Sequence, residues 1–163
     1  MAKQWGVSGG SVLDMGTGTG VLAIAFAERI PAASVVGLDL SAVALEVARE
    51  NAQKSPVSSR VSFEEGNAED MPFEDDAFDL VISSNTLHLL RNPVRMFNEI
   101  QRVLKPGGRF LIGDFRRSWL GILTEHVGSA YSAKEASDLL RQSELQNWTV
   151  RDSFFWLTLL SAM

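Results

Sequence analysis

The sequence contains no cysteine, and this absence excludes disulfides, thiolate nucleophiles and thiolate metal sites. Histidine is nearly as scarce. The two present, His88 and His126, lie too far apart for typical metal-ligand spacing, so we predict no metal site. No apolar run reaches the roughly 18 residues of a membrane-spanning helix, and residues 1–16 lack the apolar core of a signal peptide. We therefore expect a cytoplasmic protein without a membrane span.

Positive charge is also in deficit. The chain has 15 Lys and Arg against 20 Asp and Glu, a formal net charge of -5, so no domain-wide positive field favours binding to nucleic acid. Its 163 residues are 45% hydrophobic, which suits one globular domain with a sizeable core. No repeat, low-complexity tract or charged tail indicates a boundary. We predict a single domain over residues 1–163.

Short apolar runs alternate with helical patterns from residue 11 to residue 115. The runs predict strands, and the intervening patterns predict helices near 19–30, 41–54 and 93–104. The strands are expected at 11–15, 34–39, 60–65, 78–84 and 108–115. This alternation indicates an α/β fold with a parallel sheet and helices on both faces. Residues 132–143 predict a further helix, and 148–160 predict two strands as a tight antiparallel pair.

Apolar residues at helical spacing indicate which helix faces turn toward the core. The predicted core-facing positions are Leu22, Phe26, Ile30, Val43, Val47, Phe97, Ile100 and Leu104. Residues with known preferences at element ends indicate the boundaries. These are Pro31 after the first helix, Ser41 and Ser132 as caps, Pro93 in a first turn, and Pro106, Gly107 and Gly108 as a turn into a strand.

The stretch VLDMGTGTG at 12–20 places Gly16, Gly18 and Gly20 directly after the first predicted strand. Such a turn lets backbone N–H groups and a helix N-terminus approach a ligand. The dinucleotide fingerprint requires glycine or alanine at Val21, and the phosphate-binding P-loop requires a lysine that is absent here. A different nucleoside ligand therefore fits the turn better than a nicotinamide cofactor or a nucleoside triphosphate.

Asp39 ends the second predicted strand, 19 residues beyond Gly20. A carboxylate at this place can accept hydrogen bonds from both ribose hydroxyls of an adenosine ligand. The alternative is that Asp39 caps the helix that begins near Ser41. Together with the glycine turn, the position of Asp39 favours the ribose hypothesis.

Four segments in this order resemble the class I S-adenosylmethionine-dependent methyltransferases: VLDMGTGTG, VVGLDLS, GNAEDMPFEDDAFDLVISSNTLHLL and NPVRMFNEIQRVLKPGGRFLIGDF. The resemblance is strong over residues 11–115 and is nearest to the small-molecule branch that includes ubiquinone and menaquinone biosynthesis methyltransferases. It implies a Rossmann-like, doubly wound sheet of seven strands, mostly parallel with an antiparallel last strand. It also implies S-adenosylmethionine as methyl donor and S-adenosylhomocysteine as product.

The resemblance further implies which residues hold this cofactor. Asp14 and the glycine loop match the segment under the methionine part, and Asp39 matches the ribose acid. Leu40 matches an apolar residue on the adenine ring, with ordinary core as the alternative, and Ser83 lies where backbone carbonyls meet the ammonium group. The implied cofactor residues are Asp14, Gly16, Gly18, Gly20, Asp39, Leu40, Asn67, Ala68, Glu69 and Ser83. The family often has aspartate at the place of Asn67, the first residue of the adenine-edge segment.

Methyl transfer from a sulfonium requires mainly alignment of donor and acceptor, so no conspicuous catalytic residue is needed. An acidic acceptor must also lose a proton, and His88 is the first candidate base, with a structural histidine as the alternative. Asp114, at the end of the fifth predicted strand, is the second. Its alternatives are a helix cap or a partner for Arg116 or Arg117. His126 and Tyr131 are guesses for the acceptor site.

Few residues precede the first predicted strand, and little chain follows the fifth before the last helix, so we expect little or no substrate lid. An open site for a large acceptor, a homodimer or partner that completes the pocket, and a missing amino-terminal segment all fit. The leading hypothesis is an active methyltransferase on a small-molecule or lipid-like acceptor. A non-catalytic methyltransferase-like subunit and an NAD(P)-dependent oxidoreductase are the alternatives.

Overall fold

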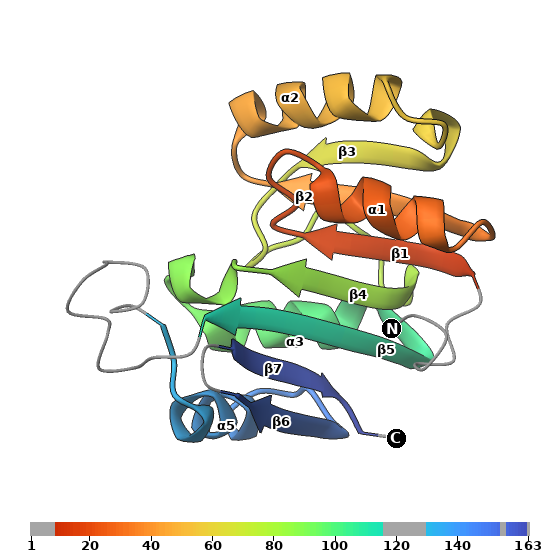
Figure 1. Cartoon of the computed structure of the whole chain (residues 1–163). Coiled ribbons are helices and arrows are strands. Elements are labelled where there is room, and N and C mark those ends of the chain that lie inside the picture. Colours follow the sequence, from red (N-terminus) through yellow and green to blue (C-terminus); the bar gives the residue numbers. More distant parts are fainter. Residues whose placement is uncertain (1–8, 116–129, 154–155, 163) are drawn as a thin grey trace.

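The computed structural model describes residues 9–115, 130–153 and 156–162 (Figure 1). The strands in these ranges form one seven-stranded sheet in the order β3-β2-β1-β4-β5-β7-β6. They are β1 Gly10–Met15, β2 Ala33–Asp39, β3 Val61–Glu65, β4 Phe78–Ser84, β5 Leu104–Phe115, β6 Trp148–Asp152 and β7 Trp156–Ser161. The helices are α1 Val21–Arg29, α2 Ala42–Gln53, α3 Pro93–Val103 and α5 Ala133–Arg141, with short 3-10 turns η2 Ser58–Arg60 and η3 Leu87–Leu89.

The sheet is parallel from β3 to β5 and antiparallel beyond it. β1 pairs with both β2 and β4, so the strand order reverses direction at the centre of the sheet. β7 pairs antiparallel with β5, and β6 pairs antiparallel with β7. The predicted mostly parallel sheet with an antiparallel ending is confirmed. Reversal between β1 and β4 opens a crevice at their carboxyl ends, where ligands bind in open α/β sheets.

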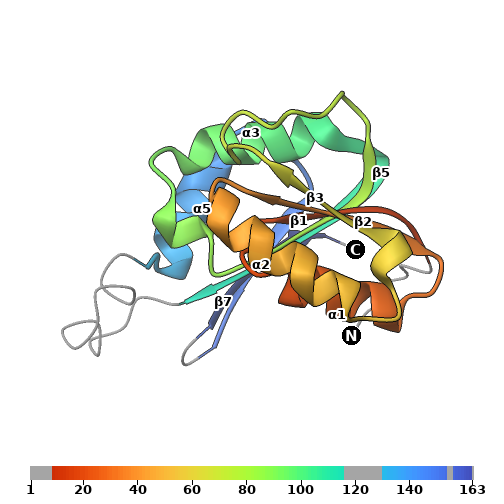
Figure 2. The same ribbon diagram turned by 90° about the horizontal axis from the view of Figure 1, so that it is seen from above.

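Helices cover both faces of the sheet, as Figure 2 shows with α1 and α2 on one side and α3 and α5 on the other. Alternating side chains of the strands therefore enter two cores. Val12, Leu80 and Ile82 face α1 and α2, while Leu13 and Val81 face α3 and α5. Each fully buried side chain of this size contributes about 1.5–3 kcal/mol of transfer free energy.

Side-chain caps fix the starts of three helices. The Ser41 hydroxyl accepts from Ala44 N–H at the start of α2, and Ser132 forms a capping box with Glu135 at the start of α5. Both serine caps were predicted. α3 has Pro93 in its first turn, as predicted, and Asn92 as its cap. α1 differs, because its N-cap is Gly20 and no side chain caps its first N–H groups.

The carboxyl end of α1 is held by an arginine from a distant part of the chain. The Arg60 guanidinium donates to the carbonyl oxygens of Ala27 at 2.8 Å, Ala33 at 2.9 Å and Ile30 at 3.3 Å. Carbonyl groups at a helix end lack intrahelical partners, and a cation there also complements the helix dipole. Arg60 thus fixes α1, and with it the glycine loop at the other end of that helix.

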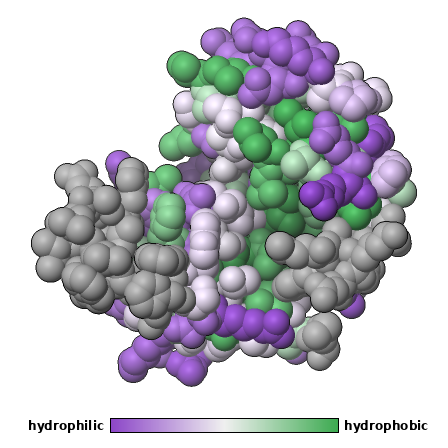
Figure 3. Space-filling model, viewed as in Figure 1, coloured by the Kyte–Doolittle hydropathy of each residue, from purple (hydrophilic) through white to green (hydrophobic). Residues whose placement is uncertain are grey.

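The prediction that Val43 and Val47 face the core is wrong. Both are exposed, by 72% and 41%, whereas Leu45 and Ala48 are buried. Figure 3 shows apolar side chains at one end of the otherwise mostly hydrophilic surface over α2. Two rows of apolar residues on α2 have helical spacing. The row that contains Leu45, Ala48 and Ala52 is buried, because its small alanine side chains allow α2 to lie close to the sheet.

The predicted turn at Pro106–Gly108 lies inside β5 as a bulge. Leu104 pairs with Phe78, and the next pair joins Arg109 to Leu80, so the intervening residues of β5 are accommodated opposite a single residue of β4. Gly107 has φ of 80°, a conformation that glycine adopts without a Cβ clash. β5 therefore begins earlier than the sequence indicated.

No helix in the described parts of the chain is long and apolar enough to cross a bilayer.

The two stripes of α2 give a test by substitution. We expect Leu45→Ala to lower the free energy of unfolding by about 2–5 kcal/mol, because it leaves a cavity between α2 and the sheet. Val43→Ala removes a side chain that is already in solvent and should change that free energy by less than about 0.5 kcal/mol. Urea unfolding of both variants measures the difference, and equal losses would contradict the assigned buried face.

Candidate functional site

Three glycines with positive φ form the loop between β1 and α1. The φ angles of Gly16, Gly18 and Gly20 are 70°, 54° and 79°. A Cβ at Gly16 would collide with Thr86, and one at Gly20 would collide with Phe63. A Cβ at Gly18 would meet nothing within 4 Å. Gly18 therefore faces open space, where a ligand can approach the backbone closely.

The glycine loop is tied to the end of β2 by hydrogen bonds. Gly16 N–H and Thr17 N–H both donate to the Leu38 carbonyl, at 2.8 Å and 3.0 Å. Gly18 N–H donates to Asp39 Oδ2 at 2.7 Å, while Asp39 Oδ1 accepts from Ser41 N–H at 2.9 Å. Asp39 thus joins the loop to the start of α2, and Ser41 is the actual helix cap. A carboxylate has about four lone-pair sites, so Asp39 keeps acceptor capacity for a ligand.

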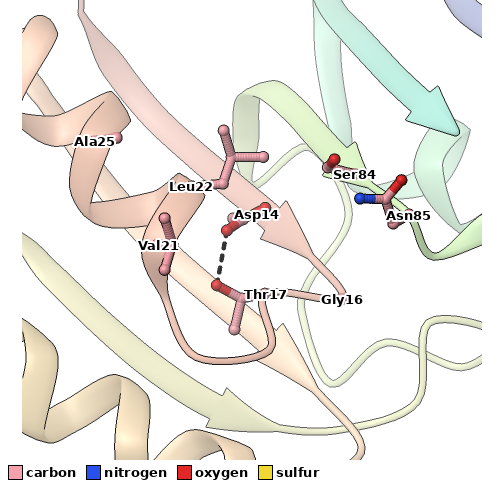
Figure 4. A pocket seen from close by; sticks show the side chains of 8 residues that line it. All are labelled: Asp14, Gly16, Thr17, Val21, Leu22, Ala25, Ser84 and Asn85. Atoms are coloured by element: carbon pink, nitrogen blue, oxygen red, sulfur yellow. Dashed lines mark hydrogen bonds between the residues drawn. The ribbon is translucent and has the colours of Figure 1, made fainter. Parts of the chain in front are cut away.

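A pocket of about 360 Å³ lies between this loop, the first turns of α1 and the end of β4. Its lining residues are Asp14, Gly16, Thr17, Val21, Leu22, Ala25, Ser84 and Asn85 (Figure 4). Sequence reasoning included Asp14 and Gly16 but missed the others. The pocket is at the carboxyl ends of β1 and β4, where the strand order reverses.

Asp14 is fully buried in the wall of this pocket. Its Oδ2 accepts from the Thr17 hydroxyl at 2.7 Å, whereas no described residue donates a hydrogen bond to its Oδ1. Burial raises the pKa of Asp14 to about 6, although the hydrogen bond from Thr17 and the nearby Ala23 N–H, which makes no well-aligned hydrogen bond to this carboxyl, both lower it. An unpaired carboxylate oxygen in a buried wall is costly without a ligand and suits a cationic one.

The residues expected at an adenine ring lie beyond β2 and β3. Leu40 is 72% exposed, so the alternative hypothesis that it belongs to the hydrophobic core is wrong. Asn67 Oδ1 accepts from Glu69 N–H at 2.9 Å, which folds the segment into a tight turn with Ala68 buried. Glu69 Oε1 accepts from the N–H groups of Arg91 and Asn92, both at 2.9 Å. Glu69 thereby fixes the chain before α3, and its predicted contact with a base stays a prediction.

Ser83 is buried at the end of β4. Its hydroxyl donates to the Met15 carbonyl at 2.8 Å and so ties β4 to β1. The Ser83 hydroxyl is therefore engaged in a hydrogen bond that joins two strands of the sheet.

His88 and Asp114, considered separately in the sequence, form a buried pair. His88 Nδ1 and Asp114 Oδ1 are 2.7 Å apart, and Asp114 also accepts from His88 N–H at 3.1 Å and Phe115 N–H at 2.6 Å. Because this carboxylate accepts from backbone donors, the consistent tautomer carries the imidazole proton on Nδ1. His88 lies in η3, just beyond β4, and Asp114 lies near the end of β5, and neither is among the residues that line the pocket.

Aromatic rings continue from this pair toward the surface. The ring of Phe115 lies edge-on to His88 at 5.9 Å and is stacked on Trp156 at 5.4 Å between centroids. Trp156 is 45% exposed at the start of β7, opposite Phe115 in the strand pairing. Of the two guesses for an acceptor site, Tyr131 packs against the core and His126 lies outside the described residues, as do Arg116 and Arg117.

Comparisons with known proteins agree with this geometry. The family model described as "Methyltransferase domain" matches residues 7–151. The chain is 34% identical over 137 residues to an uncharacterized methyltransferase, YcgJ, of Bacillus subtilis, covering 84% of this chain but 53% of that protein. It is 32% identical to the ubiquinone/menaquinone biosynthesis C-methyltransferase UbiE of a Geobacter species, covering 93% of this chain and 70% of that protein.

The chain belongs to the class I S-adenosylmethionine-dependent methyltransferases. A putative methyltransferase structure from Methanococcus maripaludis shares the fold with a TM-score of 0.82 at 22% identity, covering 99% of this chain and 82% of that one. The chain spans about half of the length of the Bacillus relative. The predicted family is confirmed, and the methyl donor of that family is S-adenosylmethionine.

Two features of this methyltransferase domain fit the cofactor. The unpartnered Oδ1 of Asp14 suits an ammonium group, and the open space above Gly18 admits a ligand against the backbone. In the described part of the chain, no group of three or more His, Asp or Glu residues could hold a metal ion.

The buried carboxyl of Asp14 predicts an unusual pH dependence of stability. Its pKa is raised from 3.8 to about 6, so the folded methyltransferase retains a proton that the unfolded chain loses first. The stabilisation is present below pH 4 and is lost as pH rises through about 6. Asp14→Asn removes this loss and should raise the free energy of unfolding at pH 7.5 by about 1–3 kcal/mol. Urea unfolding from pH 4 to 7.5 measures the effect.

Asp79→Asn serves as the control for this titration. A hydrogen bond from Lys105 is the main cause that lowers the pKa of Asp79 to about 2. The titration of Asp79 therefore changes the free energy of unfolding only at pH values below about 4. The control should leave the slope between pH 4 and 6 as in the unmodified protein. If Asp14→Asn also retains that slope, Asp14 is not the titrating group.

Proposed function

We propose that this protein transfers a methyl group from S-adenosylmethionine to a small-molecule or lipid-like acceptor. The observation that carries the proposal is the glycine loop, held by Asp39 and flanked by Asp14, whose buried Oδ1 has no hydrogen-bond partner among the described residues, at the point where the strand order reverses. When bound, the cofactor supplies an electrophilic methyl group on a sulfonium with a good leaving group.

The residues proposed to hold the cofactor surround the carboxyl ends of β1, β2 and β4. Asp39 would accept from the ribose hydroxyls, and exposed Leu40 would cover one face of the adenine ring. The turn at Asn67–Glu69 would meet the adenine edge. Asp14, the backbone of the glycine loop and the backbone at Ser83 would surround the methionine part. These residues accelerate the reaction chiefly by positioning, because aligned reactants need little further assistance.

The His88–Asp114 pair is proposed as the base that removes the acceptor's proton. With Nδ1–H directed at Asp114, Nε2 is the ring nitrogen that carries the lone pair. Asp114 orients the ring and stabilises the imidazolium that forms, as a carboxylate does for a histidine base elsewhere. Backbone N–H groups hold the carboxylate in turn, so the pair is rigid before the acceptor arrives.

The rings beside this pair support the proposed class of acceptor. The stacked Phe115 and Trp156 present an apolar, planar surface next to His88, which favours an apolar or aromatic acceptor over a charged one. The Geobacter relative is named for methylation in ubiquinone and menaquinone biosynthesis, which supports a quinol-like acceptor here.

Titration calorimetry with S-adenosylmethionine, S-adenosylhomocysteine and NADH tests the cofactor assignment. Micromolar binding of the first two without NADH supports it, and binding of NADH alone contradicts it. Turnover of a reduced 1,4-naphthoquinone with radiolabelled S-adenosylmethionine then distinguishes an active enzyme from a subunit that only binds the cofactor.

Asp39→Ala should weaken S-adenosylhomocysteine binding by about 1.5–3 kcal/mol, the contribution of charged hydrogen bonds to ribose. Calorimetry gives the affinity, and thermal unfolding checks that the fold persists. Glu46→Ala on the exposed side of α2 is the matched control and should bind normally. Unchanged affinity of Asp39→Ala in a folded protein would exclude the ribose role.

His88→Gln should lower kcat by about 10²–10⁴-fold while the affinity for S-adenosylhomocysteine stays unchanged, because a base acts on the acceptor and not on the donor. Asp114→Asn should lower kcat as well, since the ring loses its orienting partner. Initial rates across pH measure both. An unaltered pH profile in a folded His88→Gln variant would assign the pair a structural role only.

A further inference from the structure

The described helices leave one face of the sheet uncovered over β5 and β7. Figure 1 shows α1 over β1 and β2 and α3 behind β5, with none of the described helices in front of β5 and β7. Burial follows the same division. Ile112 and Leu157 point toward α3 and α5 and are buried, whereas Gly113 and Thr158 point to the side of α1 and are half-buried. Figure 3, seen from the side of α1, shows apolar side chains at the centre of this face.

A row of small residues crosses the uncovered face from the cofactor pocket. Ser84, which lines the pocket, is paired with Gly113 on β5, and Gly113 is paired with Thr158 on β7. Gly113 is not among the glycines with positive φ, and a Cβ added to it would meet nothing within 4 Å. The backbone therefore does not require glycine here. Glycine inside a strand often marks a place where a ligand approaches the backbone closely.

Larger side chains border this row on both sides and make it a groove. Phe115 and Trp156, which are paired and stacked on each other, form one wall. Leu111 and the buried Leu160, which are also paired, form the other. Leu111 and Phe115 are four residues apart on β5, a separation of about 13 Å that leaves room for a hydrocarbon chain between them. None of the residues of the floor and walls is charged, so the groove suits an apolar ligand.

The two ends of the groove indicate which ligand this is. One end joins the pocket whose wall contains the unpartnered Oδ1 of Asp14, and there the ring of Phe115 lies beside His88, the proposed base. The other end is at Arg151, an exposed residue paired with Thr158 on the edge strand β6. A ligand in the groove is thus connected to the place where donor and acceptor meet. Its other end can leave at the edge of the sheet.

We propose that the groove over Ser84, Gly113 and Thr158 binds an apolar hydrocarbon side chain of the acceptor, and that Gly113 determines whether an acceptor with such a chain fits. This inference rests on the proposed function. The reacting ring of the acceptor stays beside His88, and the chain extends from it across β5 and β7. Glycine weakens the interior of a strand, and an apolar chain that covers β5 supplies packing that the missing side chain does not.

Gly113→Leu tests this inference, because the new side chain enters open space and fills the groove without backbone strain. Gly113→Ala adds only a methyl group and gives a graded comparison, and Gly113→Val replaces Gly113→Leu if the latter does not fold. The matched control is Ser62→Leu, which places the same side chain at an exposed position of β3, at the opposite edge of the sheet.

Calorimetry in saturating S-adenosylhomocysteine compares 2-farnesyl-1,4-naphthoquinone with unsubstituted 1,4-naphthoquinone. We expect the unmodified protein and Ser62→Leu to bind the farnesyl compound about tenfold or more tightly than the unsubstituted ring. Gly113→Leu should reduce this preference to within about twofold, with Gly113→Ala between the two.

Three results would overturn the proposal: no preference for the farnesyl compound in the unmodified protein, a preference that Gly113→Leu retains, or a preference that Ser62→Leu also loses. Binding of S-adenosylhomocysteine alone is measured first for every variant and shows that the cofactor pocket is intact. Failure of the unmodified protein to bind S-adenosylhomocysteine would instead refute the proposed function.

Discussion

The hydrogen bond from Gly18 N–H to Asp39 is the contact on which the site depends. Three residues with positive φ make an intrinsically pliable loop, and the end of β2 gives it one shape through Leu38 and Asp39. The other Asp39 oxygen holds the start of α2. One carboxylate therefore sets the spacing between the glycine loop and the second helix, so that a ligand meets donors and acceptors that are already in place.

At Asp14, in contrast, the described residues leave a buried polar atom, Oδ1, without a hydrogen-bond partner. Burial without a partner for Oδ1 destabilises the ligand-free fold above the raised pKa of this carboxyl. In the proposed role of Asp14, the same atom would give a cationic ligand group an interaction that water does not weaken. Stability and affinity are thus in conflict at this residue, which is common where a site is preorganised for a charge that the protein does not contain.

The sequence predicted whatever depends on neighbours along the chain. Strand and helix order, the serine caps and the glycine loop follow from local spacing and turn chemistry. The sequence did not show which face of α2 is buried, because both of its apolar stripes have helical spacing. Val43 and Val47 were predicted to face the core, whereas Leu45 and Ala48 do so. It also could not pair His88 with Asp114, because only the alignment of β4 with β5 brings them together. Among the pocket residues that the sequence reasoning missed, Asn85 had one weak local indication, its place directly after a buried strand.

The pairing of β1 with β4 brings together segments that are far apart in the sequence, with Val12 beside Leu80 and Asp14 beside Ile82. Loop closure between such distant segments costs more chain entropy than pairing of neighbouring segments does, and such non-local contacts slow folding. Both walls of the pocket are absent until this pair forms. A cofactor that needs both walls binds only the assembled sheet, so its concentration adds to the stability of the folded chain by mass action.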